Sequence, residues 1–150
     1  MFDVVFKMKG RWRAELRGPD GALKQVREGD NVVVTNGKEY LASFLYSAAL
    51  GAATFTMKYV AIGTDATTEA ASNTALGTEV ARHTGTVSYI SGQIYQVRAT
   101  FGTGVGVGAI TEYGIFSSST GGTLFNRDVE AAINKGANDT LTVIAQVTIS

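Results

Sequence analysis

The feature that most constrains the fold of this chain is a strict alternation of apolar and polar side chains in several separate segments. Successive side chains of a β-strand point to opposite faces of a sheet, so a period of two indicates a strand with one buried face. The segments with this period are residues 2–8, 11–17, 93–101 and 140–149. The chain is therefore expected to place several half-buried strands around a shared core.

Turn-forming residues separate these segments. "GPDG" at 18–21, "EGDN" at 28–31, "SG" at 91–92 and "KGAND" at 135–139 contain the residue types that tight turns favour. Eighteen glycines against one proline also fit a chain with many turns. About nine short strands follow from this spacing, without alternating helices. The prediction is a mainly β fold, an antiparallel β-sandwich of jelly-roll-like or Ig-like form with one short α-helix.

The one helix is expected after the valine run at residues 32–34. Asn36 can cap its start, Glu39 lies three positions later where its carboxylate can reach back, and Gly51 is placed to end it. The apolar side chains of this segment recur at i, i+3, i+4 and i+7, as on a helix with one buried face. They are Leu41, Phe44, Leu45 and Ala48. The helix is expected to lie across one end or one face of the sheet.

Composition excludes several classes of site. The 150 residues fit a single domain, residues 1–150, and the 13 basic and 13 acidic side chains cancel, so no domain-wide basic field for nucleic acid is expected. The absence of cysteine excludes disulfides, thiol nucleophiles and cysteine-ligated zinc. No stretch approaches the ~20 apolar residues of a membrane helix, and the N-terminal segment does not resemble a signal peptide. A soluble chain without membrane contact is expected.

The remaining motifs indicate no catalytic site and no cofactor. "GTGVGVG" at 102–108 has Val107 where a dinucleotide fingerprint needs its third glycine, so a flexible hairpin loop or a bulge is expected. His83 is the only histidine and is expected on the surface or at a strand edge, not at a metal. Asp and Asn in the turns are ordinary turn formers rather than calcium ligands. Because no acid–base pair and no activated nucleophile stands out, an enzyme is not expected.

Two groups of side chains are candidates for contacts with a partner. Arg11, Arg13 and Arg17 share a strand face with Glu15, which fits either a solvated face at a sheet edge or a contact with an acidic neighbouring subunit. Trp12 with the six tyrosines suggests a sugar-stacking surface, and core or cross-strand packing explains these residues equally well. Both pairs of alternatives stay open at the level of the sequence.

Four blocks of the sequence, in order, resemble virion structural proteins of tailed bacteriophages. They are "NVVVTNGKEYLASFL" (31–45), "YVAIGTDATTEAASNTALGTEVAR" (59–82), "ITEYGIFSSSTGGTLFNR" (110–127) and "INKGANDTLTVIAQVTI" (133–149). The shared elements are written here with h for a hydrophobic residue and x for any residue. The first is the entry to a helix, and the second is a Y-h-A-h-G-T strand followed by a loop that ends in T-x-L-x-x-E-h-x-R. The third is an I-T-E-x-G-h-F strand, and the last is a K-G-x-x-D-T-L-T-h strand. The resemblance covers most of residues 31–150 and leaves residues 1–30 outside it.

The resemblance implies a small non-enzymatic module of a phage virion, assembled in the cytoplasm of the host bacterium. The compact size favours a capsid decoration (cement) protein that stabilises the shell through repeated contacts. The alternative is a tail-fibre, baseplate or other tail accessory component, and a second alternative is a carbohydrate-binding module. Expected partners are the major capsid protein or other virion proteins and further copies of the chain, as a trimer or dimer, with no nucleic acid and no membrane.

A subunit contact would suit the small side chains of the second block. Ala, Thr and Ser lose little conformational entropy on ordering, and a near-zero net charge limits repulsion between crowded copies. Residues 1–30 would add an N-terminal hairpin or arm for such contacts. The expected interface residues are Arg11, Trp12, Arg13, Arg17, Thr64, Thr67 and Thr68.

Overall fold

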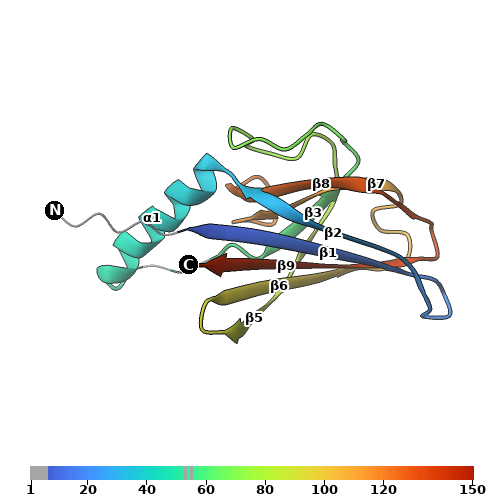
Figure 1. Ribbon diagram of the computed structural model, residues 1–150, viewed down its shortest axis with the longest axis horizontal. Helices are drawn as coiled ribbons and strands as arrows, with labels where there is room; N and C mark the ends of the chain where they lie inside the picture. Colours follow the sequence, from blue (N-terminus) through green and yellow to red (C-terminus); the bar gives the residue numbers. More distant parts are fainter. Residues whose placement is uncertain (1–6, 53, 55) are drawn as a thin grey trace.

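Nine strands and one helix make up the described part of the chain in the computed structural model (Figure 1). The structure describes residues 7–52, 54 and 56–150, so residues 2–6 of the first expected strand lie outside the described residues. The elements are β1 (Met8–Arg17), β2 (Leu23–Val33), α1 (Thr35–Ala49), β3 (Tyr59–Gly63), β4 (Glu79–Thr84), β5 (Thr86–Ser91), β6 (Ile94–Phe101), β7 (Gly108–Phe116), β8 (Leu124–Lys135) and β9 (Thr140–Ile149).

All nine strands belong to one antiparallel sheet with the order β4-β3-β7-β8-β2-β1-β9-β6-β5. β4 and β5 lie at the two ends of this order, yet only Gly85 separates them in sequence. The sheet must therefore curl until its ends approach each other, and the His83 ring of β4 stacks on Phe101 of β6 with ring centroids 4.8 Å apart. The result is a half-barrel. The expected mainly antiparallel β fold with one helix is confirmed, whereas a two-layer sandwich or jelly roll is not confirmed.

The alternation in the sequence decides which side chains fill the concave side of the half-barrel. The apolar residues of β1 pair across the ladder with those of β9 and are buried with them: Trp12, Ala14 and Leu16 with Ala145, Val143 and Leu141. Each large apolar side chain buried in this way contributes roughly 1.5–3 kcal/mol. β1 and β2 therefore form a hairpin in the middle of the sheet, and its role in subunit contacts stays a prediction.

Three of the expected turns join neighbouring strands, and one does not form. "GPDG" joins β1 to β2, "SG" lies between β5 and β6, and "KGAND" joins β8 to β9, where Asp139 Oδ2 accepts a 2.8 Å hydrogen bond from the Gly136 amide. The turn expected at 28–31 is wrong, because these residues continue β2. Gly29 leaves room for the Glu130 carboxylate of β8, which would have to move aside for a residue with a Cβ.

The two halves of the sheet meet along β2 and β8, where only two residue pairs are in register. Beyond these pairs, side chains of β2 replace the missing ladder bonds. Arg27 donates to the carbonyls of Ala131 and Ala132, both at 3.1 Å, and Gln25 Oε1 accepts from the Asn134 amide at 3.1 Å. A polar seam therefore crosses a sheet that is otherwise held by backbone pairing.

The start of α1 differs from the expectation. The helix begins at Thr35, its N-cap is Val34, and no side chain caps it. The Val34 amide donates to the Phe125 carbonyl at 3.1 Å, so a contact with β8 orients the chain before the helix begins. The capping role expected for Asn36 and Glu39 is therefore wrong.

The end of α1 agrees with the expectation, but its apolar face is only half covered. Gly51 follows the helix with a φ of 72°, the left-handed conformation that glycine adopts at helix ends. Of the expected apolar face, Leu41 and Phe44 are partly buried, whereas Leu45 and Ala48 are exposed. Figure 1 shows why: α1 projects beyond the sheet at the end where the C-terminus lies.

The close approach of α1 to β8 depends on Gly37, the one buried residue of the helix. A Cβ at this position would overlap the Phe125 carbonyl. A Gly37→Ala variant is expected to lower the free energy of unfolding by about 1–3 kcal/mol, because backbone cannot move aside as a flexible side chain can. Urea denaturation measures this, with Gly102→Ala as the control, since nothing lies within 4 Å of a Cβ there. Equal stabilities of the two variants would contradict the close contact.

Residues 102–108 do not form the expected hairpin loop. β6 pairs with β5 and β9, whereas β7 pairs with β3 and β8, so this segment crosses between the two halves of the sheet. Gly104 and Gly106 adopt positive φ values of 74° and 60°. Lys135 Nζ donates to the Gly102 carbonyl at 2.8 Å and fixes the start of the crossover.

Candidate interaction surfaces

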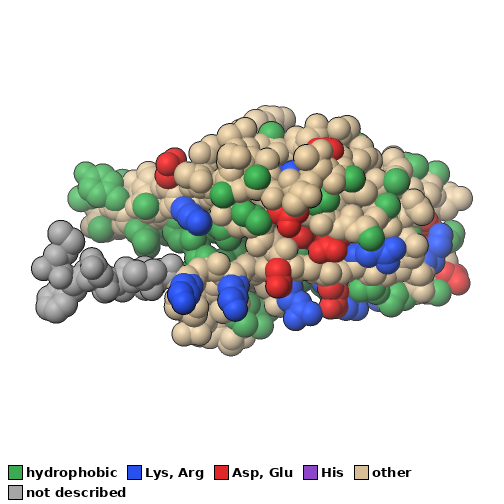
Figure 2. All heavy atoms as spheres, turned by 45° about the horizontal axis from the view of Figure 1, so that its top comes forward, with side chains coloured by type: hydrophobic (Ala, Val, Ile, Leu, Met, Phe, Trp, Pro, Cys, Tyr) green, Lys and Arg blue, Asp and Glu red, His purple; other side chains and the backbone are tan. Residues whose placement is uncertain are grey.

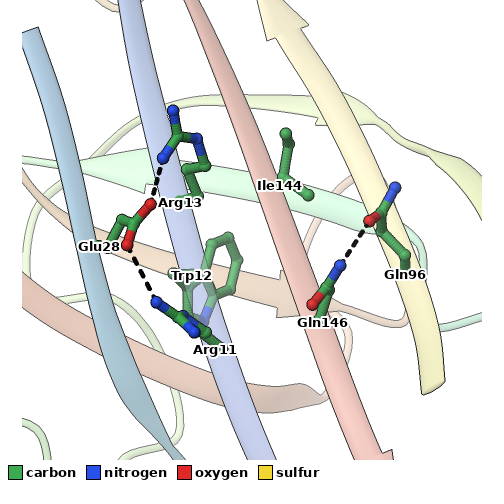
Figure 3. A pocket seen from close by; sticks show the side chains of 7 residues that line it. All are labelled: Arg11, Trp12, Arg13, Glu28, Gln96, Ile144 and Gln146. Atoms are coloured by element: carbon green, nitrogen blue, oxygen red, sulfur yellow. Dashed lines mark hydrogen bonds and ion pairs between the residues drawn. The ribbon is translucent and has the colours of Figure 1, made fainter. Parts of the chain in front are cut away.

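The arginines of β1 alternate with its buried apolar residues and therefore lie on the other face of the sheet; Figure 3 shows Arg11 and Arg13. Arg11 Nη2 lies 3.0 Å from one oxygen of Glu28, and Arg13 bonds to the other oxygen. Arg13 and Arg17 also bond to Glu15 at 2.7 and 3.2 Å. The hydrogen bonds from Arg13 are the largest cause that holds the pKa of Glu15 and of Glu28 below the ordinary value of a glutamate. The arginines thus share a face as expected, and their role in a subunit contact stays a prediction.

A shallow groove runs beside these arginines, across β1, β9 and β6. Ile144 lies along it, and Gln146 donates to the Gln96 side-chain oxygen at 2.9 Å, as Figure 3 shows. Its polar groups are bonded to one another: Glu28 pairs with both Arg11 and Arg13, and Glu15 also pairs with Arg13. The groove is therefore a largely self-satisfied polar surface, which fits a flat partner better than a small charged ligand.

Trp12 is one of the residues that line this groove (Figure 3), but almost none of its surface is exposed there. Its side chain is 2% exposed on the concave side, where its ring centroid lies 5.8 Å from that of Tyr113. Stacking on a sugar and contact with a partner both need an exposed ring, so the burial of Trp12 counts against both roles. Tyr46 and Tyr89 are the strongly exposed tyrosines among the described residues, on α1 and β5 respectively.

The loop from residue 64 to residue 78 is held by a buried carboxylate. Glu112 of β7 is fully buried and accepts hydrogen bonds from the amides of Gly77 at 2.8 Å, Thr78 at 2.7 Å and Asp65 at 3.3 Å. Both ends of the loop are therefore tied to one side chain. Net stabilisation by hydrogen bonds to a charged group is typically about 1.5–3 kcal/mol each.

Arg127 of β8 supplies the counter-charge of Glu112. Its Nη2 and Nε lie 2.8 and 3.0 Å from Glu112 Oε2, and only 2% of the arginine is exposed. The same guanidinium donates to Asp65 Oδ2 at 3.2 Å and to Asn73 Oδ1 at 3.1 Å, both in the loop. The pair Glu112–Arg127 thus organises the whole loop from beneath.

The threonines expected at an interface lie on this loop. Thr67 and Thr68 are exposed and Thr64 is partly buried. Thr67 donates through its hydroxyl and its amide to Asp65 Oδ1, and these bonds are the main cause of a pKa of Asp65 below its ordinary value. Figure 1 shows the loop between β3 and β4 well apart from β1, so the predicted arginines and threonines do not form one continuous site.

Arg82 joins the end of the second sequence block to the third block. It donates to the carbonyls of Ser118 at 2.9 Å and Gly121 at 2.7 Å, and its guanidinium lies 3.6 Å from the centre of the Phe116 ring. Glu79 pairs with it at 2.6 Å. Arg82 and Glu79 are thus engaged in contacts within the chain.

Asp128 of β8 is a buried acid whose oxygens find no hydrogen-bond partner in the described part of the chain, and sequence reasoning missed it. The residue is 0% exposed, and neither carboxylate oxygen has a hydrogen-bond partner among the described residues. Burial is the largest cause that raises its pKa to about 8, and the nearby charges of Glu130, Glu69 and Asp30 contribute to the same rise. Its ladder neighbour Tyr113 has a buried hydroxyl that also lacks a partner within the described part of the chain. At pH 7 the protonated, neutral form of Asp128 is favoured.

The acidic residues around Asp128 do not form a metal centre. Within residues 7–52, 54 and 56–150, no group of three or more histidine, cysteine, aspartate or glutamate side chains is arranged to hold a metal ion. The surrounding acids instead raise the free energy of the ionised form of Asp128.

Exposed apolar side chains gather at the end of the molecule that carries α1. On the helix and just after it, Leu45, Tyr46 and Leu50 are 57%, 70% and 67% exposed. The edge strand β5 adds Val87, Tyr89 and Ile90. Figure 1 places α1 and the β5–β6 hairpin at the same end, and Figure 2 shows hydrophobic side chains at the tip of the helix. These six residues are called the apolar end below.

Comparison with protein-family models, with curated proteins and with solved structures gave no match. In the described part of the chain, no helix has both the length and the apolar character needed to cross a membrane. A function must therefore be inferred from the surfaces above together with the sequence blocks.

Proposed function

We propose that the chain is a non-enzymatic structural protein of a phage virion that binds neighbouring proteins, most simply as a capsid decoration protein. The observation that carries the proposal is the apolar end, where α1 and β5 each expose large apolar side chains. Contiguous exposed apolar surface marks protein-binding sites on otherwise soluble folds. The open edge of β5 adds unpaired backbone groups that a partner strand can use.

The contacts of the buried charged side chains also support a structural role. Glu112, Arg127 and Lys135 bond to backbone groups or to one another and thereby fix loops. The carboxyl of Asp128, whose pKa is strongly raised, is fully buried, so a substrate cannot reach it. A site for acid–base chemistry needs such groups at an accessible cleft.

Purified phage particles that encode this chain provide the test. Quantitative mass spectrometry of density-gradient fractions is expected to find the chain in a copy number comparable to that of the major capsid protein, because a decoration protein occupies each repeat of a lattice. The major tail protein serves as the internal control. A few copies per particle would favour the tail component instead, and absence from the particles would contradict a virion role.

A further inference from the structure

α1 carries apolar side chains on two opposite faces, and the chain covers one of them. Tyr40 and Leu41 are partly buried against the core of the half-barrel, and Tyr40 also bonds to the Thr56 hydroxyl at 2.8 Å. The other face repeats at i, i+3, i+4 and i+7, and its members, here called the outer stripe, are all exposed: Ala42, Leu45, Tyr46 and Ala49. A helix that is apolar all round is normally buried. None of the described residues covers the outer stripe, so this face of α1 is available to a second molecule.

The charged residues near the outer stripe limit which kind of partner can bind to it. No charged residue lies between Glu39 and Lys58 in the sequence, so the stripe neither repels a second copy nor selects an oppositely charged partner. The last turn of α1 contains no basic residue, which leaves the negative end of the helix dipole without a counter-charge from the helix itself. Lys38, exposed and one turn before Ala42, continues the stripe at the opposite end of the helix.

We propose that two copies of the chain form a dimer through the outer stripe, with their α1 helices antiparallel. In this arrangement Ala42 faces Ala49 of the partner subunit, and Leu45 faces the partner's Tyr46. The small alanines allow the helix axes to approach, and the larger pair fills the centre of the contact. A two-fold contact of this kind is self-complementary, since each stripe meets an identical one.

Lys38 decides between antiparallel and parallel pairing. When the helices are antiparallel, each Lys38 lies beside the C-terminal carbonyls of the other helix, where a cation is typically worth about 0.3–1 kcal/mol. Parallel pairing brings the Lys38 side chains of the two copies together and aligns the helix dipoles unfavourably. The same repulsion counts against a parallel three-helix contact about a three-fold axis.

The proposed dimer rests on the proposed function only because both use the apolar end. Experiments can contradict either proposal without contradicting the other. A chain that is monomeric in solution would overturn the dimer while leaving a role in the particle intact. Absence from particles would overturn that role without affecting self-association.

Sedimentation velocity of the purified chain tests the dimer. The wild type is expected to sediment with about twice the 15.8 kDa mass of one chain. Tyr46→Glu places a charge in the stripe and is expected to raise the dissociation constant at least about tenfold, as loss of a central aromatic contact does. Leu23→Glu, at an exposed position on the first residue of β2, is the matched control and is expected to leave the dimer unchanged. A monomeric wild type, or a dimer that Tyr46→Glu leaves intact, would overturn the proposal.

Cysteine crosslinking tests the antiparallel arrangement, because the chain has no cysteine of its own. An oxidised mixture of Ala42→Cys and Ala49→Cys chains is expected to give a disulfide-linked product that contains one copy of each. Either variant alone is expected to crosslink far less, since like positions are separated along the axis. Circular dichroism of each variant confirms that α1 is retained. Efficient crosslinking of Ala42→Cys with itself would contradict antiparallel pairing.

Discussion

An Arg127→Met variant is expected to lose about 3–5 kcal/mol of unfolding free energy, because it leaves the fully buried Glu112 carboxylate without its counter-charge. The loop held by Glu112 is expected to loosen as well, since Asp65 and Asn73 lose their contacts with the guanidinium. Denaturant unfolding measures the first effect. Hydrogen exchange at the amides of Gly77 and Thr78, both donors to Glu112, measures the second.

Two controls separate this effect from the loss of any arginine. Arg11→Met breaks an ion pair whose arginine side chain is 65% exposed, and such pairs are worth about 0.2–1 kcal/mol. A double variant, Glu112→Gln with Arg127→Met, is expected to be less destabilised than the sum of its single variants, because the unpaired charge is gone. If Arg127→Met costs no more than Arg11→Met, the buried pair does not organise the loop.

An Asp128→Asn variant is expected to be more stable than the wild type at pH 7, by about 2–4 kcal/mol, because it removes a buried acid with a raised pKa. In the unfolded chain this carboxyl ionises near its model value of 3.8, whereas in the folded protein its pKa is about 8. Between these values the folded state holds a proton that the unfolded state has lost. The contribution of Asp128 to stability is therefore complete below about pH 4, falls as the pH rises, and is constant above about pH 8.

The pH dependence of the variant gives the sharper test. The stability difference between Asp128→Asn and the wild type is expected to grow from pH 4 to pH 8 and then to level off. Asp65 and Asp139 have lowered pKa values, so their contributions to stability are lost as the pH falls below the ordinary pKa of an aspartate. Both proteins contain these two residues, so they do not change the difference between the proteins. Glu39→Gln, the same chemical change on an exposed helix residue, is expected to alter stability by less than about 0.5 kcal/mol. A difference that does not vary with pH would show that Asp128 is ionised in the folded protein.

Local pattern predicted most of the strands but not the shape of the sheet. Residues 11–17 and 140–149 show the period of two that their burial in β1 and β9 requires, and Gly51 ends α1 as its sequence position indicates. The curl could not be read from any one segment. It follows from the pairing of β4 and β5 with opposite halves of the sheet on either side of Gly85. Alternation predicts which face of a strand is buried, but it does not predict which strand lies next to it.

The turn expected at 28–31 and the cap expected at Asn36 failed for a common reason. In each case a tertiary contact with β8 overrides the local preference: the Glu130 carboxylate over Gly29, and the Phe125 carbonyl at the Val34 amide. Glycine beside acidic residues is typical of a turn, and it equally fits a strand that another chain segment approaches closely. Sequence alone does not distinguish the two.

The buried charges were missed because their partners are distant in sequence. Arg127 and Asp65 are 62 positions apart in the sequence, and no local spacing of residues predicts a pair so distant. One signal was present: Asn126, Arg127 and Asp128 are three polar residues in succession, directly after the apolar Leu124 and Phe125 of the same strand. Polar residues at central strand positions require partners or a shifted pKa, and they point to the seam and to the anchor of the loop.

A density map of the intact particle tests the central claim most directly. The account predicts a half-barrel of this size repeated over the capsid lattice, with α1 and β5 at contacts between proteins and no open cleft that holds a ligand. Finding the chain outside the particle, as a free protein whose α1 and β5 touch nothing, would contradict it.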